Sequence, residues 1–311
     1  MAEVLRPMST GELLDRTFTL YRRNFKLFVG IATLGPAAYL LFQLLMAGSV
    51  GVPAMTGRAS GVMGASLGTG VILGMLVMLT GMAIAHGATV KAVAAVHLGR
   101  SITIGEAYKS LKGRIGRILG VFFTVILLVS AAAIVIIALA AILGSLAVIG
   151  GAQAGTAGAI AGGLVGIVAA VVGAMLAITI YVRYALAVAA CVVEDIGVRP
   201  SLKRSAFLSK GSRSRILAVY FVFGVLAWIF GAALGALAQG LAFLVHNAVA
   251  RIVPVFLASF IAGSLTGPLA TIGISLVYYD ERVRKEAFDL QLMMASLEPP
   301  AQGPVPVPVQ P

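Results

Sequence analysis

The stretch YYDERVRKEAFDLQ (residues 278–291) carries seven charged residues in fourteen, and the run of residues 252–279 that leads into it carries none. A transmembrane helix needs about 20 consecutive apolar residues. The run is therefore long enough to cross a bilayer, and the charged stretch marks the point where the chain leaves it. The rest of the chain can be divided by the same contrast.

The whole composition is that of an integral membrane protein. The chain has 311 residues, is 60% hydrophobic and 11% charged, and has a mean hydropathy of +1.03. Soluble domains average about 25% charged residues. Six apolar runs are long enough to be spans, at residues 27–47, 67–90, 118–143, 158–182, 216–245 and 252–279.

These runs predict an all-α polytopic bundle of six transmembrane helices, because isolated strands cannot satisfy their backbone polar groups in hydrocarbon. We expect one membrane domain over residues 1–297, with an interfacial helix at 9–25 and a cytoplasmic helix at 280–297. The proline-rich residues 298–311 are expected to be a disordered tail. Charged residues precede the first apolar run, so a cleaved signal peptide is not expected.

The distribution of Lys and Arg predicts the orientation. The N-terminal segment has five, the segment between spans two and three six, the segment between spans four and five seven, and the C-terminal segment three. The three alternate loops together hold only Arg58 and Arg251. Basic residues stay on the cytoplasmic side, so both termini are predicted to be cytoplasmic.

The formal net charge of +12 follows from this topology. A nucleic-acid partner is not expected, because the sequence has no soluble module that could present a basic face. Anionic lipid is the expected partner, since each basic residue near an anionic membrane surface contributes about 1 kcal/mol.

The two long basic segments resemble each other. TIGEAYKSLKGRIGRILGVFF (residues 103–123) aligns with SLKRSAFLSKGSRSRILAVYF (201–221) at an offset of 98, and STGELLDRTFTLYRRNF (9–25) aligns with the first at an offset of 94. The alignment predicts a threefold pseudo-repeat, in which each unit is a basic amphipathic helix followed by two spans. Repeats of this kind are also common in transporters.

The N-terminal copy has the periodicity of an amphipathic helix. Ser9 or Thr10 can cap it, and apolar residues recur at spacings of three and four. We expect this apolar face to lie against the lipid at the membrane interface. It comprises Leu13, Leu14, Thr17, Phe18, Tyr21 and Phe25.

Two cations stand close to apolar sequence, namely Arg183 at the end of span four and Lys91 in span two. One hypothesis is that both snorkel to the cytoplasmic interface. The other is that Arg183 faces the bundle interior and pairs with a carboxylate or a lipid phosphate. Further candidates for contact with lipid, an anion or a carboxylate lie before span five: Arg204, Lys210, Arg213 and Arg215.

The sequence contains no arrangement typical of a catalytic or metal site. His86 and His97 are eleven residues apart, about 16 Å along a helix, and the hydrolase, zinc-protease and P-loop motifs are missing. We expect no cofactor and no enzymatic activity. Cys191 is the single cysteine and is expected to be a packing residue.

Glycines recur in pairs four residues apart, such as Gly231 with Gly235 and Gly263 with Gly267. Such pairs allow close helix packing in membranes. The adjacent Gly267 and Pro268 are the strongest candidates for a break in span six.

The opening stretch itself predicts a helix that leaves the bilayer. Tyr278 and Tyr279 would be interfacial anchors. Charges of opposite sign then recur four residues apart, a spacing that stabilises helices. We expect this helix to pack against the basic segments and to offer a docking surface made of Asp280, Arg282, Arg284 and Glu286.

Three stretches together resemble a known family: LRPMSTGELLDRTFTLYRRNF (residues 5–25), VVEDIGVRPSLKRSAFLSKGSRSRIL (192–217) and YYDERVRKEAFDLQ. They are similar to the glycerophosphoryl diester phosphodiesterase membrane-domain family of bacteria. The resemblance implies a six-span module of the bacterial inner membrane, found alone or fused to an enzyme. It does not imply catalysis, because the chemistry of the fused proteins belongs to a separate soluble barrel.

Two functional hypotheses follow. The first is a non-catalytic scaffold or accessory protein that contacts anionic lipid and another envelope protein. The second is a permease or channel for a small or lipid-derived solute, which is consistent with the repeat and with Arg183.

Overall fold

The computed structural model describes residues 7–48, 63–151, 156–247 and 250–287, and all regular structure within them is helical. The helices are α1 Thr10–Arg23, α2 Phe25–Ala32, α3 Leu34–Met46, α5 Met63–His97, α6 Ile104–Lys109, α7 Ile115–Gly151, α8 Thr156–Tyr184, α9 Ala187–Glu194, α10 Val198–Leu208, α11 Arg213–Leu244 and α12 Ile252–Glu286. The predicted disordered tail, the end of the predicted cytoplasmic helix and the first six residues lie outside this part of the chain.

Six helical stretches in the described residues are long and apolar enough to cross a membrane. They are Phe25–Met46, Gly70–His97, Ile115–Ile142, Ile160–Glu194, Arg213–Leu244 and Ile252–Glu286. Each overlaps one of the six runs predicted from hydropathy. The protein is therefore a multi-pass, all-helical membrane protein.

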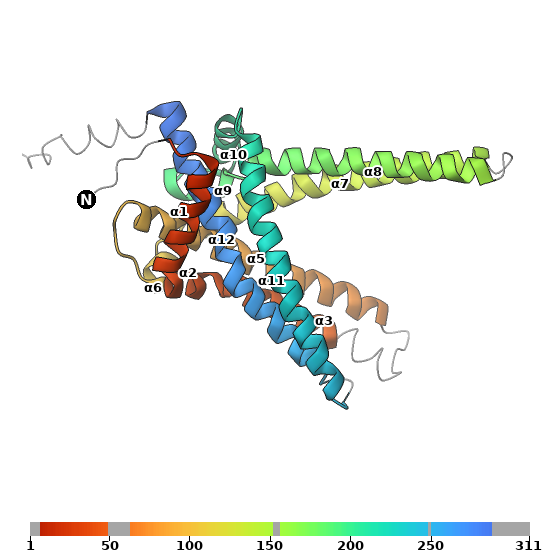
Figure 1. Cartoon of the computed structure of the whole chain (residues 1–311), viewed down its shortest axis with the longest axis horizontal. Helices are drawn as coiled ribbons and strands as arrows, with labels where there is room; N and C mark the ends of the chain where they lie inside the picture. The colour runs from red at the N-terminus through yellow and green to blue at the C-terminus, as the bar shows by residue number, and fades with distance from the viewer. Residues whose placement is uncertain (1–6, 49–62, 152–155, 248–249, 288–311) are drawn as a thin grey trace, which may run out of the picture.

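The spans pair as three helical hairpins, α3 with α5, α7 with α8, and α11 with α12. The first and third hairpins pack on each other through α12, which contacts both α3 and α5. Figure 1 shows the α7–α8 hairpin leaving the rest of the molecule in a separate direction. Within the described residues, that hairpin contacts α5, α9, α10 and α11, which lie at its base in Figure 1.

The core lies at the end of the molecule where the hairpins meet. Ala187, Ala190 and Cys191 of α9 are buried there against the inner half of α12, whose Ile272, Leu276 and Val277 are also buried. The outer half of α12 differs, because Val253, Leu257 and Ile261 are exposed. Each long helix thus has a protein-covered inner part and an exposed apolar outer part.

The apolar face predicted for α1 is partly covered by protein. Leu13 and Thr17 are buried, Leu14 and Tyr21 are partly buried, and Phe18 and Phe25 are exposed. The sequence predicted that this whole face would lie against lipid. It could not show that α12 packs along α1 and covers part of that face.

Span four is interrupted between Tyr184 and Ala187, where α8 ends and α9 begins. The Ser205 hydroxyl donates to the Arg183 carbonyl at 2.9 Å and accepts from the Leu186 N–H at 3.1 Å. The Ser209 hydroxyl also donates to the Arg183 carbonyl, at 3.1 Å. Two buried serines of α10 therefore satisfy backbone groups that the break leaves unpaired.

Span six, in contrast, is continuous through Gly267 and Pro268, where the sequence favoured a break. Proline removes one backbone hydrogen bond in a helix interior. Close by, the Tyr21 hydroxyl donates to the Leu265 carbonyl at 2.6 Å. Burial raises the pKa of this phenol, so it remains a donor, and packing against α1 supports α12 at this level.

Of the two glycine pairs expected from the sequence, Gly263–Gly267 has one member in close contact, because a Cβ on Gly263 of α12 would lie 3.0 Å from the Pro36 side chain of α3. A Cβ built on Gly231 or Gly235 meets no atom within 4 Å, so this pair packs against nothing in the described residues. A Cβ on the buried Gly81 of α5 would lie 2.4 Å from the Ala38 Cβ of α3. Since Ala38 has no flexible side chain that could move, Gly81 fixes how closely α3 and α5 approach.

We predict that Gly81→Ala lowers the free energy of unfolding by about 1–3 kcal/mol, because the two helices must separate. Thermal unfolding of the purified protein in detergent measures the effect. Gly231→Ala is the matched control, and it should leave the midpoint unchanged or raise it, since alanine favours helix by about 1 kcal/mol. Equal midpoints for the two variants would contradict a close contact at Gly81.

A second prediction concerns the break in span four. Ser205→Ala removes the acceptor of the buried Leu186 N–H, which costs about 1–3 kcal/mol. Ser209→Ala should cost less, because the Arg183 carbonyl keeps its bond from Ser205. Unfolding midpoints of the two variants give the comparison, and a larger loss for Ser209→Ala would show that the bonding is assigned wrongly.

Candidate functional site: a charged cluster at the end of the sixth span

The most polar part of the structure surrounds the last turns of α12. Its members, which we call the charged cluster, are Glu194, Arg204, Arg215, Asp280, Glu281, Arg282, Arg284, Lys285 and Glu286. They come from α9, α10, α11 and α12. The cluster therefore joins two parts of the chain that are distant in sequence, residues 194–215 and 280–286.

Within α12 the charges alternate in sign at a spacing of four residues. Asp280 pairs with Arg284 at 2.7 Å, Glu281 with Lys285 at 3.3 Å, and Arg282 with Glu286 at 3.2 Å. The three pairs inferred from the sequence are thus present. Because neighbouring residues point to different sides of a helix, α12 presents charge to α1, to α10 and to α11 at once.

One half of the cluster is built on Arg215 of α11. Its guanidinium lies 2.6 Å from an Asp280 oxygen and 3.2 Å from a Glu281 oxygen. Both carboxylates are buried, with residue exposures of 1% and 0%. A buried charge is tolerated only when it is paired, and Arg215 joins Arg284 and Lys285 in pairing these two carboxylates.

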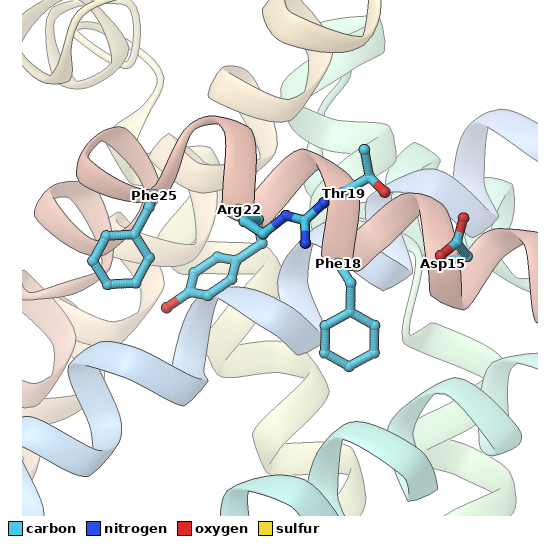
Figure 2. Close-up of a pocket in the computed structure, with 6 residues that line it drawn as sticks. Asp15, Phe18, Thr19, Arg22 and Phe25 are labelled. Atoms are coloured by element: carbon cyan, nitrogen blue, oxygen red, sulfur yellow. The ribbon is translucent and has the colours of Figure 1, made fainter.

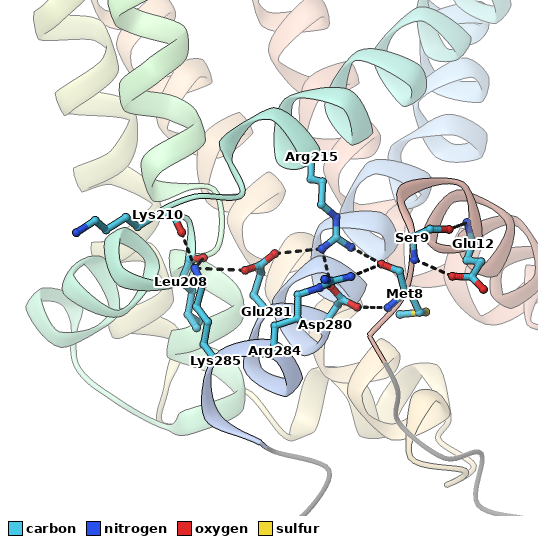
Figure 3. A network of polar contacts seen from close by, with 10 residues as sticks. All are labelled: Met8, Ser9, Glu12, Leu208, Lys210, Arg215, Asp280, Glu281, Arg284 and Lys285. Atoms are coloured by element: carbon cyan, nitrogen blue, oxygen red, sulfur yellow. Dashed lines mark hydrogen bonds and ion pairs between the residues drawn. The ribbon is translucent and has the colours of Figure 1, made fainter.

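The same half holds the chain that precedes α1 (Figure 3). The Met8 N–H donates to Asp280 at 2.6 Å, and the Met8 carbonyl accepts from Arg215 at 3.0 Å and from Arg284 at 2.6 Å. Both backbone groups of Met8 are therefore bound by charged side chains. Immediately afterwards Ser9 caps α1, with the Glu12 side chain returning to the Ser9 N–H at 2.7 Å.

The other half is built on Arg204 of α10. Its guanidinium pairs with Glu194 at 2.8 Å and also with Glu286. These contacts, with the hydrogen bond to Glu286 the largest, raise the pKa of Arg204 above its ordinary value. The Tyr278 hydroxyl donates to Glu194 at 2.5 Å, so Glu194 joins α9 to both α10 and α12.

Lys285 closes the cluster against the end of α10. Its ammonium donates to the carbonyls of Leu208 at 2.5 Å and Lys210 at 2.7 Å (Figure 3). These carbonyls lie at and just beyond the C-terminus of α10, where the helix dipole favours a positive charge. Lys285 thus acts as a cap supplied by another helix.

A separate ion pair links α7 to the loop after α9. Asp195 forms ion pairs with Arg114, directly before α7, at 2.8 Å and with Arg117 at 2.5 Å. Arg117 also donates to the Asp195 carbonyl at 2.9 Å. Asp195 has φ +57°, a conformation that aspartate tolerates better than most residues, and the two arginines hold it there.

The arrangement joins helices and does not expose a reactive group. Asp280 and Glu281 are buried and paired, and Glu194 and Glu286 each contact Arg204. A general acid or base must lie within hydrogen-bond reach of its substrate. Buried carboxylates already engaged by arginine do not meet that requirement.

The structure brings together six of the ten residues singled out from the sequence: Arg204, Arg215, Asp280, Arg282, Arg284 and Glu286. The predicted docking surface is thus occupied in large part by contacts within the chain. Arg183, Lys210 and Arg213 are exposed and Lys91 is partly buried. The Arg183 guanidinium stands over the Tyr184 ring, 5.6 Å from its centroid.

For this region the sequence led to one wrong prediction, about Tyr278 and Tyr279, and to no prediction for Glu194. Tyr278 and Tyr279 were predicted to be interfacial anchors, but both are buried in the core, because α9 and α5 pack over them. Glu194 was not singled out. Its position directly after the apolar run of α9, beside Asp195, was the available signal.

Comparison of the chain with family models, with curated proteins and with solved structures finds no match.

We predict that Arg215→Met destabilises the protein by about 1–3 kcal/mol, because the buried Asp280 and Glu281 lose their shared partner and keep only Arg284 and Lys285 as ion-pair partners. Thermal unfolding in detergent measures this loss. The control is Arg213→Met, which removes an exposed cation two residues away and should shift the midpoint little. Similar losses in both variants would indicate that general charge, and not the buried pair, determines stability.

Proposed function

We propose that this protein is a non-catalytic scaffold or accessory protein of the bacterial inner membrane, which contacts anionic lipid and another envelope protein. The observation that carries the proposal is the exposed α7–α8 hairpin. Ile134 and Ile137 of α7 and Ile160 and Ile167 of α8 are all more than 60% exposed, on helices that pack mainly on each other. A second membrane protein could dock there without displacing any contact of this chain.

The hairpin is internally well packed, which suits a docking element. A Cβ on Gly173 of α8 would lie 2.0 Å from the Ile136 side chain of α7, so the two helices are in close contact. A rigid pair of helices loses little conformational freedom when it binds a partner.

The proposed orientation places the charged cluster and both termini in the cytoplasm. It is supported by the excess of Lys and Arg in the segments at that end of the spans. The exposed cations Lys109, Lys112, Lys210 and Arg213 would then face the cytoplasmic surface, which carries anionic lipid.

The threefold repeat remains part of the proposal and has structural support. A short helix precedes each hairpin: α1, α6 and α10. The first two begin with the same capping box, Ser9 with Glu12 and Thr103 with Glu106. Gly113 and Gly211, aligned in the sequence, both have positive φ, +81° and +85°, in the turns that lead into α7 and α11.

The resemblance to the glycerophosphoryl diester phosphodiesterase membrane-domain family is likewise a proposal. It is compatible with six spans whose charged segments form one structural unit. The same unit argues against catalysis in this domain, because the charges in the resembling stretches pair largely with one another.

A permease is the second candidate, and one observation favours it. Polar pairs lie between the first and third hairpins: Ser259 donates to Gln43 at 3.0 Å, and Thr271 lies 3.1 Å from His86. A solute path would need polar groups within the bundle. These groups contact each other directly. We therefore propose that they serve helix packing, and transport is the second candidate function.

We predict that a photo-crosslinking residue at Ile134 or Ile167 captures one defined membrane protein in cells that express the chain. The same residue at Leu237 or Trp228, exposed positions of α11, should capture lipid alone. Mass spectrometry identifies the products. Ile134→Ala combined with Ile167→Ala should abolish co-purification of that protein, whereas Leu237→Ala should not.

Three results would contradict the proposal. Capture of lipid alone at the hairpin would contradict the proposal of a protein partner. Crosslinks between two copies of the chain would replace the accessory role with self-association. Solute flux into proteoliposomes that is lost in Gln43→Ala or Thr271→Val would favour the permease.

A further inference from the structure

A groove of about 400 Å³ lies beside α1 near its junction with α2. Figure 2 shows the Phe18 and Phe25 rings and the Arg22 side chain along this helix. The lining residues are Asp15, Phe18, Thr19, Tyr21, Arg22 and Phe25. Phe18, Arg22 and Phe25 are spaced four and three residues apart, so they share one helical face.

The groove lies at the level where α12 changes from buried to exposed. The Tyr21 hydroxyl bonds to the Leu265 carbonyl. On one side of that level α12 exposes Ile261, Leu257 and Val253, and on the other side it is mostly buried from Pro268 to Glu281. If the exposed half of α12 lies in lipid, the end of α1 meets the bilayer surface.

Three cations surround this junction without an ion pair or hydrogen bond of their side chains to the described residues. Arg22, Arg23 and Lys26 are all exposed, in contrast to Arg204 and Arg215, which bind carboxylates. They lie within five residues of one another. The positive charge here is therefore available to a ligand.

Aromatic and cationic groups alternate along the groove. Phe18 is 42% exposed and Phe25 44% exposed, and Phe18 also packs on Phe223 of α11, 5.5 Å between ring centroids. Aromatic side chains are favoured at membrane interfaces. Arginine binds phosphate oxygens through two parallel hydrogen bonds.

We propose that this groove binds the headgroup of an anionic phospholipid. Arg22 contacts the phosphate, Arg23 and Lys26 add positive charge, and an acyl chain runs against Phe18 and Phe25. This site deepens the proposed function, on whose lipid contact it rests. None of the three cations was among the lipid-binding candidates chosen from the sequence.

Asp15 is the single carboxylate in the groove, and it lies seven residues before Arg22. That separation is about 10 Å along the helix axis, so Asp15 does not oppose a phosphate at Arg22. Three cations against one distant carboxylate favour an anionic headgroup over a zwitterionic one.

A tryptophan placed in the groove can report its occupancy. Trp228 is the single tryptophan of the chain, so Trp228→Phe with Phe18→Trp gives a local probe. We expect brominated phosphatidylglycerol to quench this probe more strongly than brominated phosphatidylcholine at equal mole fraction. Arg22→Gln should reduce the relative preference about fivefold, the effect of one basic residue at an anionic surface, and adding Arg23→Gln and Lys26→Gln should abolish it.

The matched control neutralises three exposed cations outside the groove, Arg100→Gln with Lys109→Gln and Lys112→Gln. This variant should keep the preference. If both triple variants lose it equally, general surface charge explains the binding and the groove is not a site. If wild-type protein shows no preference for anionic lipid, the lipid part of the proposed function fails as well.

Two further measurements distinguish an anionic lipid from other ligands. Loss of quenching by brominated phosphatidylethanolamine in Asp15→Asn would overturn the anionic assignment in favour of an aminophospholipid. Competition by inorganic phosphate would show that the groove binds free phosphate and not lipid. We expect neither result.

Native mass spectrometry tests the same site without the tryptophan changes. Protein incubated with an equimolar mixture of the two lipids should retain phosphatidylglycerol in the wild type and in the control triple variant, and lose it in the groove triple variant. Retention by the groove variant would overturn the proposal even if the tryptophan probe failed to fold.

Discussion

The buried ion pair between Arg215 and the Asp280–Glu281 pair is the contact on which the arrangement of helices depends. Moving a carboxylate from water into a protein interior costs several kcal/mol unless a counter-charge and hydrogen bonds replace the water. Two adjacent carboxylates, both buried, therefore require α11 and the chain before α1 to be present together. Arg204 places the same requirement on α9 and α10 through Glu194 and Glu286. The inner ends of the hairpins are thus fixed by charge, whereas their outer ends are free to diverge.

Helix length explains why a membrane protein has such a core. α12 has 35 residues and α7 has 37, about 52 Å and 55 Å at 1.5 Å per residue. The hydrocarbon layer is about 30 Å thick. The remaining length cannot all lie in lipid, and the inner halves of α5 and α12 instead pack with α9 and α10. Because the inner half of α12 is buried against other helices and not in lipid, α12 can begin as a membrane span and end in charged residues.

The sequence predicted the parts of this structure that local physics determines. Six spans follow from hydropathy, because a backbone in lipid must be helical, and the three pairs within α12 follow from a spacing of four. It did not predict Arg215 with Asp280, since the two are 65 residues apart and meet only after the helices pack. The break after Tyr184 also escaped prediction, because no glycine or proline marks it and its bonds come from Ser205 and Ser209. Periodicity identified the apolar face of α1 but not whether protein or lipid covers it.

The α7–α8 hairpin shows how differently exposure must be interpreted in this protein. In water, helices that expose Ile134, Ile137 and Ile167 would aggregate or collapse onto the remaining spans. In lipid the surrounding chains are as apolar as these side chains, so separation carries no hydrophobic cost and association depends on close packing and polar contacts. The first and third hairpins have such contacts with each other, through Gly263 with Pro36 and through Ser259 with Gln43. Beyond the base of the second hairpin, the close contact of Gly173 with Ile136 joins that hairpin's own two helices. Its separation from the bundle is therefore a consequence of where the small residues lie, and whichever molecule approaches it must bring the complementary packing surface.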